Sequence, residues 1–240
     1  MIDRVLLKDT AATLGITIDD TAAEKLDIYA RLLVEWNEKM NLTAITDPEG
    51  IVLKHFVDSL TALPLLPQMP FSLIDVGTGA GFPGLPLAIL RGDMQLTLLD
   101  SLNKRLIFLE EVCRAVDVSA TRIHARAEEG GRNPELRDRF DVATARAVAG
   151  LPVLCELCLP FVKVGGRFLA LKGPDAPRER EEAARAVKTL GGRFVEGVAV
   201  TLPNPTDEGG TSERHILVIE KTVATPKKFP RPNAKKATPL

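Results

Sequence analysis

The pattern of hydrophobic and polar positions changes near residue 70 of this 240-residue chain. Before that point, apolar residues recur every three or four positions, most clearly at Leu26, Tyr29, Leu32, Leu33 and Trp36. This spacing gathers apolar side chains on one face of an α-helix. Prolines at 64, 67 and 70 then interrupt the pattern. Residues 1–68 are therefore expected to form a helical N-terminal extension packed on the rest of the protein.

From residue 71 onward, strand-like and helix-like segments alternate. Short apolar runs that favour strands lie at 71–76, 95–100, 120–125, 140–145, 166–172, 193–202 and 214–221. Helical patterns lie at 83–91, 103–117, 150–162 and 176–190. Strict alternation of strand and helix predicts a parallel sheet that is covered by helices on both faces.

The last two predicted strands depart from this alternation. Residues 203–210 join them, and this Pro- and Gly-containing segment shows no helical pattern. Adjacent strands without a crossover must pair antiparallel. The expected fold is therefore α/β and Rossmann-like, with a mostly parallel seven-stranded sheet that ends in an antiparallel hairpin. Residues 69–222 would form this core, and residues 223–240 would form a basic, Pro-rich C-terminal tail.

The first predicted strand runs into a loop that has an acid and glycines at alternate positions. The loop reads Asp75-Val-Gly77-Thr-Gly79-Ala-Gly81, and a helical run follows it. Glycine allows a sharp turn and lets a ligand approach the backbone, and the free N–H groups at a helix start favour anionic groups. Gly77 and Gly79 are therefore candidate cofactor-binding residues.

Two nucleotide-type cofactors compete for this loop. Residues 79–84 satisfy the G-x-G-x-x-G pattern of a dinucleotide site, which would bind NAD. The acid inside the turn, Asp75, instead resembles the first motif of the class I S-adenosylmethionine (SAM) methyltransferases, whose sheet also ends in an antiparallel hairpin. SAM is therefore the expected cofactor, and NAD is the alternative.

Further candidates follow later strands, at the edge where open α/β sheets bind cofactors. Asp100 ends the second strand and could accept hydrogen bonds from both ribose hydroxyls. Ala127 and Glu128 could present a backbone N–H and a carboxylate to the edge of adenine, or could simply lie at a helix start that favours acids. Arg146 could bind the carboxylate of SAM or, equally, an RNA phosphate.

The residues after the fourth strand limit the chemistry. Residues 144–147 read Thr-Ala-Arg-Ala, which contains neither the Cys nucleophile of pyrimidine C5 methylation nor the Asn/Asp-Pro-Pro-Tyr/Phe motif typical of adenine-amine methylation. Guanine N7 needs neither, because its lone pair is exposed and unprotonated at neutral pH. Alignment of N7 with the methyl group would provide most of the rate acceleration. No catalytic acid or base is therefore assigned.

Cysteine and histidine add little to this chemistry. Three cysteines in a chain of this length do not indicate a disulfide framework. Cys155 and Cys158 have C-x-x-C spacing, but their apolar neighbours favour core packing over zinc or redox chemistry, and no metal is expected. His55 lies in a mostly apolar helix, where a structural role is the default and a role near the substrate is the alternative. No apolar window reaches 18 residues, and no leader is evident, which predicts a cytoplasmic protein without a membrane span.

The charge is distributed unevenly along the chain. The net charge is −1, and residues 221–240 carry six Lys and Arg residues and no acid, so residues 1–220 carry −7. A basic, Pro-rich segment without periodicity is expected to be extended or disordered. We hypothesise that residues 221–236 contact the phosphates of a nucleic acid, which would be rRNA under the resemblance given below, while the glycine-loop pocket alone binds SAM. The alternative is a tail that only promotes solubility.

Together, these motifs resemble the bacterial small-subunit rRNA guanine-N7 methyltransferases, also called the glucose-inhibited division protein B family. The matching stretches lie at 36–43, 54–60, 75–86, 100–105, 126–128, 144–147, 171–173 and 225–231. The resemblance implies SAM contacts at Gly77, Phe82, Ala127, Glu128 and Arg146.

The resemblance also implies a substrate. It implies methyl transfer to N7 of a guanine in the 530 loop of 16S rRNA, at nucleotide 527 by family convention, with 16S rRNA or the small ribosomal subunit as the partner. The protein is expected to be a monomer. Two alternatives remain: a class I methyltransferase acting on a protein or small molecule, and a non-enzymatic RNA-binding assembly factor.

Overall fold

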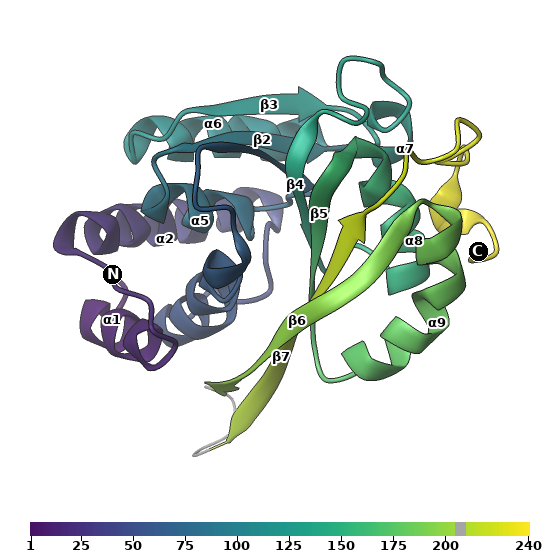
Figure 1. Ribbon diagram of the computed structural model, residues 1–240. Coiled ribbons are helices and arrows are strands. Elements are labelled where there is room, and N and C mark those ends of the chain that lie inside the picture. Colours follow the sequence, from purple (N-terminus) through teal and green to yellow (C-terminus); the bar gives the residue numbers. More distant parts are fainter. Residues whose placement is uncertain (205–209) are drawn as a thin grey trace.

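The computed structural model describes residues 1–204 and 210–240. Within these residues, seven strands form one sheet in the order β3-β2-β1-β4-β5-β7-β6 (Figure 1). Their bounds are β1 (Phe71–Val76), β2 (Met94–Asp100), β3 (Ala120–His124), β4 (Phe140–Arg146), β5 (Val162–Lys172), β6 (Gly192–Pro203) and β7 (Thr211–Lys221). Strands β1 to β5 pair in parallel, whereas β7 pairs antiparallel with β5 and β6. The predicted sheet with its terminal hairpin is confirmed, although residues 205–209 of the predicted connection lie outside the described residues.

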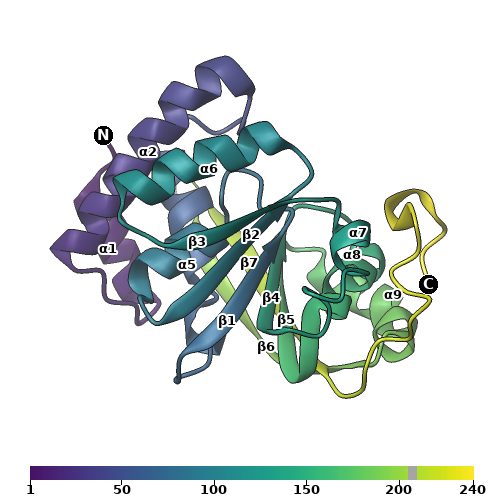
Figure 2. The same ribbon diagram turned by 90° about the horizontal axis from the view of Figure 1, so that it is seen from above.

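Helices cover both faces of the sheet, as the alternation predicted. They are α5 (Gly84–Leu90), α6 (Asn103–Ala115), α7 (Ala127–Gly130), α8 (Leu151–Cys158) and α9 (Ala176–Thr189). Figure 2 shows α5 and α6 on one side of the sheet and α7, α8 and α9 on the other. Each side has its own apolar cluster, one including Leu85 and Leu109 and the other including Leu154 and Val187.

The largest difference from the predicted boundaries lies between α8 and β5. The sequence pattern predicted a helix over 150–162, but α8 ends at Cys158 and β5 already begins at Val162. Pro160 explains the early end, because proline in a helix interior removes an N–H donor and clashes with the preceding turn. A 3₁₀ turn, Leu159–Phe161, makes the connection. Gly165, which has a positive φ of 86°, and Gly166 interrupt the apolar pattern near the start of β5. The sequence pattern therefore did not predict the first residues of this strand.

The N-terminal extension consists of helices. It contains α1 (Arg4–Thr13), α2 (Asp20–Met40) and a further helical segment made of α3 (Pro48–Gly50), a π-helical stretch (Ile51–Val57) and α4 (Asp58–Leu60). The N-cap of α2 is Asp19, whose side chain accepts a hydrogen bond from the Ala22 N–H at 2.7 Å. A short-side-chain acid at this position satisfies an N–H group that the helix leaves free. The buried Tyr29 of α2 donates from its hydroxyl to the Ala80 carbonyl, so the extension packs directly against the glycine loop.

The C-terminal tail is ordered, so the expectation of an extended or disordered segment was wrong. Phe229 and Ala234 are buried in the same apolar cluster as residues of α8 and α9, and the turn that contains Ala234 contacts α8. Arg137 donates to the carbonyls of Thr225 and Phe229 at 2.7 and 2.8 Å. Lys221 is fully buried, and its Nζ donates to the Leu159 carbonyl at 2.6 Å. Composition could not predict this order, because the tail is held by hydrogen bonds from arginines far away in the sequence and not by a local apolar pattern.

Candidate functional site

Asp75 organises the glycine loop from inside the protein. It is fully buried at the end of β1, and its Oδ2 accepts hydrogen bonds from the Thr78 hydroxyl at 2.7 Å and the Gly84 N–H at 3.1 Å. Its Oδ1 accepts from the Thr144 hydroxyl of β4 at 3.2 Å. Burial raises the pKa of Asp75 to about 6, although these hydrogen bonds oppose the shift. The acid therefore fixes both ends of the loop rather than facing a ligand.

Two glycines of this loop serve different purposes. Gly77 and Gly81 both have positive φ, at 70° and 100°. A Cβ on Gly81 would collide with the Tyr29 hydroxyl, so this position is required by the packing of α2. Gly77 instead lines a pocket, where a Cβ would lie 3.0 Å from Val148. The sequence pattern could not separate these two roles, because the partner of Gly81 lies far away in the sequence.

The pocket beside Gly77 lies at the carboxyl ends of β1, β2, β3 and β4 and has a volume of about 190 Å³. Four of the predicted cofactor residues line it: Gly77, Asp100, Ala127 and Glu128. They lie at or just after the ends of three strands, β1, β2 and β3, which the parallel sheet brings to one edge. The structure thus brings together the residues that were selected from strand ends.

Asp100 is buried at this edge and is already largely hydrogen-bonded. Its Oδ1 accepts from the Leu102 N–H at 2.9 Å, and its Oδ2 accepts from the Gly79 N–H at 2.9 Å. Arg105 Nη1 lies 3.3 Å from the same Oδ2. A carboxylate offers about four lone-pair sites, so these contacts leave room for roughly one further donor. Gly79 itself does not line the pocket, and its contribution there is to position Asp100.

Glu128 is the least satisfied acid in the pocket. It is buried, and its Oε1 has no hydrogen-bond partner among the described residues. Arg126 Nε lies 3.9 Å from Oε2, too far for a hydrogen bond. A buried carboxylate oxygen without a donor is costly, which indicates a donor supplied by a ligand. The exocyclic amine of adenine is such a donor, so the residues present fit the adenosyl part of SAM.

Phe82 and Arg146 do not line this pocket. Phe82 is buried between the rings of Tyr29 and His55, at centroid distances of 5.3 and 4.5 Å. The Arg146 guanidinium lies 4.9 Å from the centre of the Phe82 ring, and its Nη1 lies 2.7 Å from Asp58 Oδ2. Both residues therefore join the glycine loop to the N-terminal extension. Their expected contact with SAM stays a prediction.

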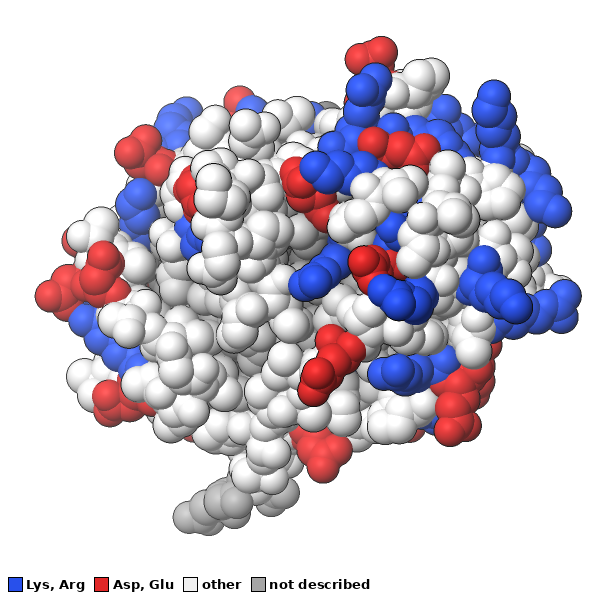
Figure 3. Space-filling model, viewed as in Figure 1, with Lys and Arg blue, Asp and Glu red and all other residues white. Residues whose placement is uncertain are grey.

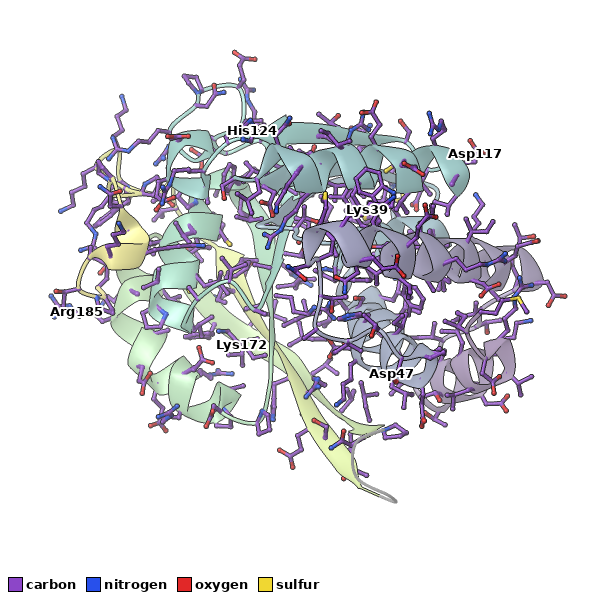
Figure 4. The ribbon with its side chains drawn as sticks, turned by 180° about the vertical axis from the view of Figure 1, so that it is seen from behind. Lys39, Asp47, Asp117, His124, Lys172 and Arg185 are labelled. Carbon is purple, nitrogen blue, oxygen red and sulfur yellow. The ribbon has the colours of Figure 1, made fainter. Side chains whose placement is uncertain are left out.

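A second pocket adjoins the first at Ala147, which lines both. Its volume is about 460 Å³, and its charged lining residues are Lys54, Asp58, Arg146, Lys172, Glu179 and Arg214. Figure 4 labels Lys172 at the end of β5, between α8 and α9 on one side and the extension with Asp47 on the other. Ala147 has a φ of 55°, which is uncommon for a residue with a side chain and is often found at functional sites.

His55 lies in this second pocket and is held neutral. Its Nδ1 lies 3.2 Å from Arg146 Nη2, and its Nε2 lies 2.8 Å from the Thr43 hydroxyl. Burial, followed by the nearby Arg146 charge, lowers the pKa of His55 to about 3. A neutral ring accepts the Arg146 hydrogen bond at Nδ1. Sequence reasoning left the role of His55 open, and the structure places it both in a hydrogen-bond network and at a pocket wall.

Two other residues of this pocket were not selected from the sequence. Arg214 of β7 pairs with Asp58 at 2.8 Å, and Lys172 of β5 pairs with Glu179 at 2.7 Å. A lone arginine on a strand gives no local signal of a site. The only available signal for Lys172 was its place in the Leu-Lys-Gly stretch at 171–173.

The cysteines lie away from both pockets. Cys155 and Cys158 of α8 are fully buried in the apolar cluster on this side of the sheet, and burial raises the pKa of both thiols. The predicted packing role is consistent with this position. Over the described ranges, no group of three or more His, Cys, Asp or Glu residues is arranged to hold a metal ion. Over the same ranges, no helix is long and apolar enough to cross a membrane.

Comparison with known proteins identifies a family. The family model described as rRNA small subunit methyltransferase G matches residues 22–204. A protein of that name from Clostridium beijerinckii is 48% identical over 228 residues, which cover 94% of this chain and 93% of the relative. Another from Acetivibrio thermocellus is 46% identical over 233 residues, which cover 97% and 94%.

Solved structures show a similar fold at low identity. A precorrin-6y C5,15-methyltransferase from Geobacter metallireducens has a TM-score of 0.52 and 18% identity, covering 74% of this chain and 90% of that chain. A putative methyltransferase from Bacillus halodurans has a TM-score of 0.53 and 14% identity, covering 69% and 99%. These likenesses support the predicted class I methyltransferase fold.

Proposed function

The chain belongs to the family of rRNA small subunit methyltransferase G, and from that premise we propose that it methylates N7 of a guanine in the 530 loop of 16S rRNA, at nucleotide 527. It is a SAM-dependent methyltransferase. The position and the atom were implied by the family resemblance of the sequence. The two adjoining pockets support the proposal, because a methyl donor and an acceptor base need neighbouring sites.

We assign the pocket beside Gly77 to SAM. When bound, SAM supplies an electrophilic methyl group on a positively charged sulfur. Glu128 would accept a hydrogen bond from the adenine amine, and Asp100 would accept one from the ribose. The observation that carries this assignment is the buried Glu128 Oε1, which has no partner among the described residues.

We assign the second pocket to the guanine and its flanking phosphates. Its lining has four cationic side chains and two acids, so it carries an excess of positive charge that suits a polyanion. Arg146 and Arg214 are both fixed by Asp58, and this arrangement orients them before RNA binds. His55 is neutral and is stacked on Phe82, so it would contribute a flat wall rather than a proton. N7 attacks through its own lone pair, which is why positioning is sufficient.

We further propose that the protein acts in the cytoplasm as a monomer. Its rRNA substrate is assembled into subunits in that compartment. The described residues of one chain line both pockets, so neither pocket requires a second copy.

A labelling experiment tests this proposed function. Purified protein is incubated with methyl-labelled SAM and small subunits, naked 16S rRNA or total cell protein, each from a strain that lacks this enzyme. We expect ribonuclease-sensitive label, located by mass mapping as 7-methylguanine in the 530 loop. Label in protein would favour a protein methyltransferase instead. RNA binding without any methyl transfer would favour an assembly factor.

A further inference from the structure

We propose that the C-terminal tail forms one wall of the SAM pocket and that Lys235 is a cofactor-binding residue. This inference rests on the proposed assignment of that pocket to SAM. Lys235 belongs to a 3₁₀ turn, Ala234–Lys236, and lines the same pocket as Gly77, Asp100 and Glu128. The tail was hypothesised to serve RNA alone, and the structure points to a different role.

The turn that contains Lys235 is held in place by contacts with α8. Ala234 is fully buried beside α8. Arg231 binds Glu156 of α8, with Nη2 and Nε donating to its two carboxylate oxygens at 2.7 and 2.9 Å. The backbone N–H of Arg231 donates to the same carboxylate at 2.7 Å. Glu156 is itself fully buried, so this ion pair holds the tail in a defined position.

The tail is also tied to the segment that follows Glu128. Arg132 Nε donates to the Pro230 carbonyl at 2.8 Å, and its Nη2 donates to the Lys228 carbonyl at 3.1 Å. Arg137 binds two more tail carbonyls and the Gly131 carbonyl. Figures 1 and 2 both show the tail beside α7, the short helix that contains Glu128. Because the tail is tied to the segment after α7, we infer that Lys235 faces the side of the pocket that Ala127 and Glu128 line.

The charge of the pocket explains why a lysine is useful there. Asp100 and Glu128 place two acids at the pocket, and an ammonium group offsets them while offering three donors. SAM has a positive sulfur, so a lysine near the sulfur would repel it. A lysine on the adenosyl side can donate to ring nitrogens or ribose oxygens without that cost. We therefore infer that Lys235 acts on the adenosyl part, which SAM and S-adenosylhomocysteine share.

The neighbouring Lys236 supplies a matched control. It lies in the same turn and is exposed like Lys235, but it does not line the pocket. Figure 3 shows further Lys and Arg side chains over this half of the molecule, so a general loss of surface charge must be distinguished from loss of a pocket contact. Both substitutions remove one positive charge, and only one of them removes a pocket residue.

Calorimetry of SAM and S-adenosylhomocysteine binding tests the inference on full-length protein. We expect Lys235→Ala to raise the Kd of both ligands by about tenfold, the effect of one charge-assisted hydrogen bond. Lys236→Ala should change neither, and thermal unfolding of the ligand-free proteins should show that all are folded. Equal Kd values for the two variants would overturn the inference. Tighter SAM binding by Lys235→Ala, with S-adenosylhomocysteine unaffected, would also overturn it, because it would place the lysine near the sulfur. Failure of the wild-type protein to bind SAM would refute the proposed function itself.

Discussion

Arg146 at the end of β4 forms an ion pair with Asp58 of α4, with 2.7 Å between Nη1 and Oδ2. Both side chains are largely buried, and the other oxygen of Asp58 pairs with Arg214 of the terminal hairpin at 2.8 Å. One carboxylate therefore joins the N-terminal extension, the centre of the sheet and the antiparallel hairpin. All three segments meet at the wall of the proposed RNA-side pocket.

Asp58→Asn should impair catalysis without impairing cofactor binding. The substitution leaves Arg146 and Arg214 without their shared counter-charge, so both guanidinium groups are held less firmly by their remaining hydrogen bonds. We expect methyl transfer to fall by about tenfold or more, and the free energy of unfolding to fall by about 3 kcal/mol, as for other broken buried pairs. Steady-state kinetics, calorimetry with SAM and chemical denaturation measure the three quantities. A tenfold rise in the SAM Kd with normal turnover would show that Asp58 serves the other pocket.

Glu128→Ala should weaken SAM binding. The change removes the buried oxygen that is proposed to accept the adenine amine, and we expect the Kd to rise by about tenfold or more. Glu135→Ala is the control, because Glu135 is an exposed acid of the same segment that does not line the pocket. Isothermal titration of the two variants compares them directly. If both bind SAM as the wild type does, Glu128 is not a cofactor ligand.

Asp75 should make the protein less stable as the pH rises. Burial raises its pKa to about 6 from an ordinary value of 3.8, so the folded state binds its proton more tightly than the unfolded state. The stabilisation is complete below pH 3.8 and is lost as the pH rises through 6. Asp75→Asn removes this titration, so the difference in unfolding free energy between wild type and variant should change by about 2–3 kcal/mol between pH 4 and pH 7. Urea denaturation at several pH values measures it, and a difference that is independent of pH would contradict the shift.

His55 should make the protein less stable as the pH falls. Burial lowers its pKa to about 3 from 6.5, so the unfolded state binds the proton more tightly. The stabilisation is present above pH 6.5 and decreases by about 1.4 kcal/mol for each pH unit below it, until the pH reaches about 3. His55→Gln should abolish this contribution. The ring resonances of His55, followed by NMR from pH 5 to pH 8, should not titrate; an inflection near pH 6.5 would refute the buried, neutral state.

The order of strands and helices could be predicted from sequence because periodicity reports local burial. Residues 71–76 and 95–100 are rich in apolar side chains, as is typical of central parallel strands. Four of the proposed cofactor residues line one pocket because each lies at or just after a strand end, and a parallel sheet collects such positions at one edge. The start of β5 was missed because Gly165 and Gly166 interrupt its apolar pattern.

What the sequence did not reveal depends on contacts between distant residues. The order of the tail depends on Arg132, Arg137 and Glu156, none of which has a local signal for this role. The hypothesis that residues 221–236 contact RNA phosphates is wrong for Lys221, because its amino group is buried beside Asp138. Arg146 was correctly placed at the edge of the sheet, but its partner Asp58 could only be found from the fold.

The most direct test of the central claim is cleavage of 16S rRNA at 7-methylguanine, mapped by primer extension. Borohydride and aniline break the chain at this modified base. Three strains are compared: one with the native protein, one that lacks it and one that carries Glu128→Ala. We predict a strong stop at nucleotide 527 with the native protein, none in its absence and a weak stop with the variant. An unchanged stop in the strain that lacks the protein would contradict the assignment.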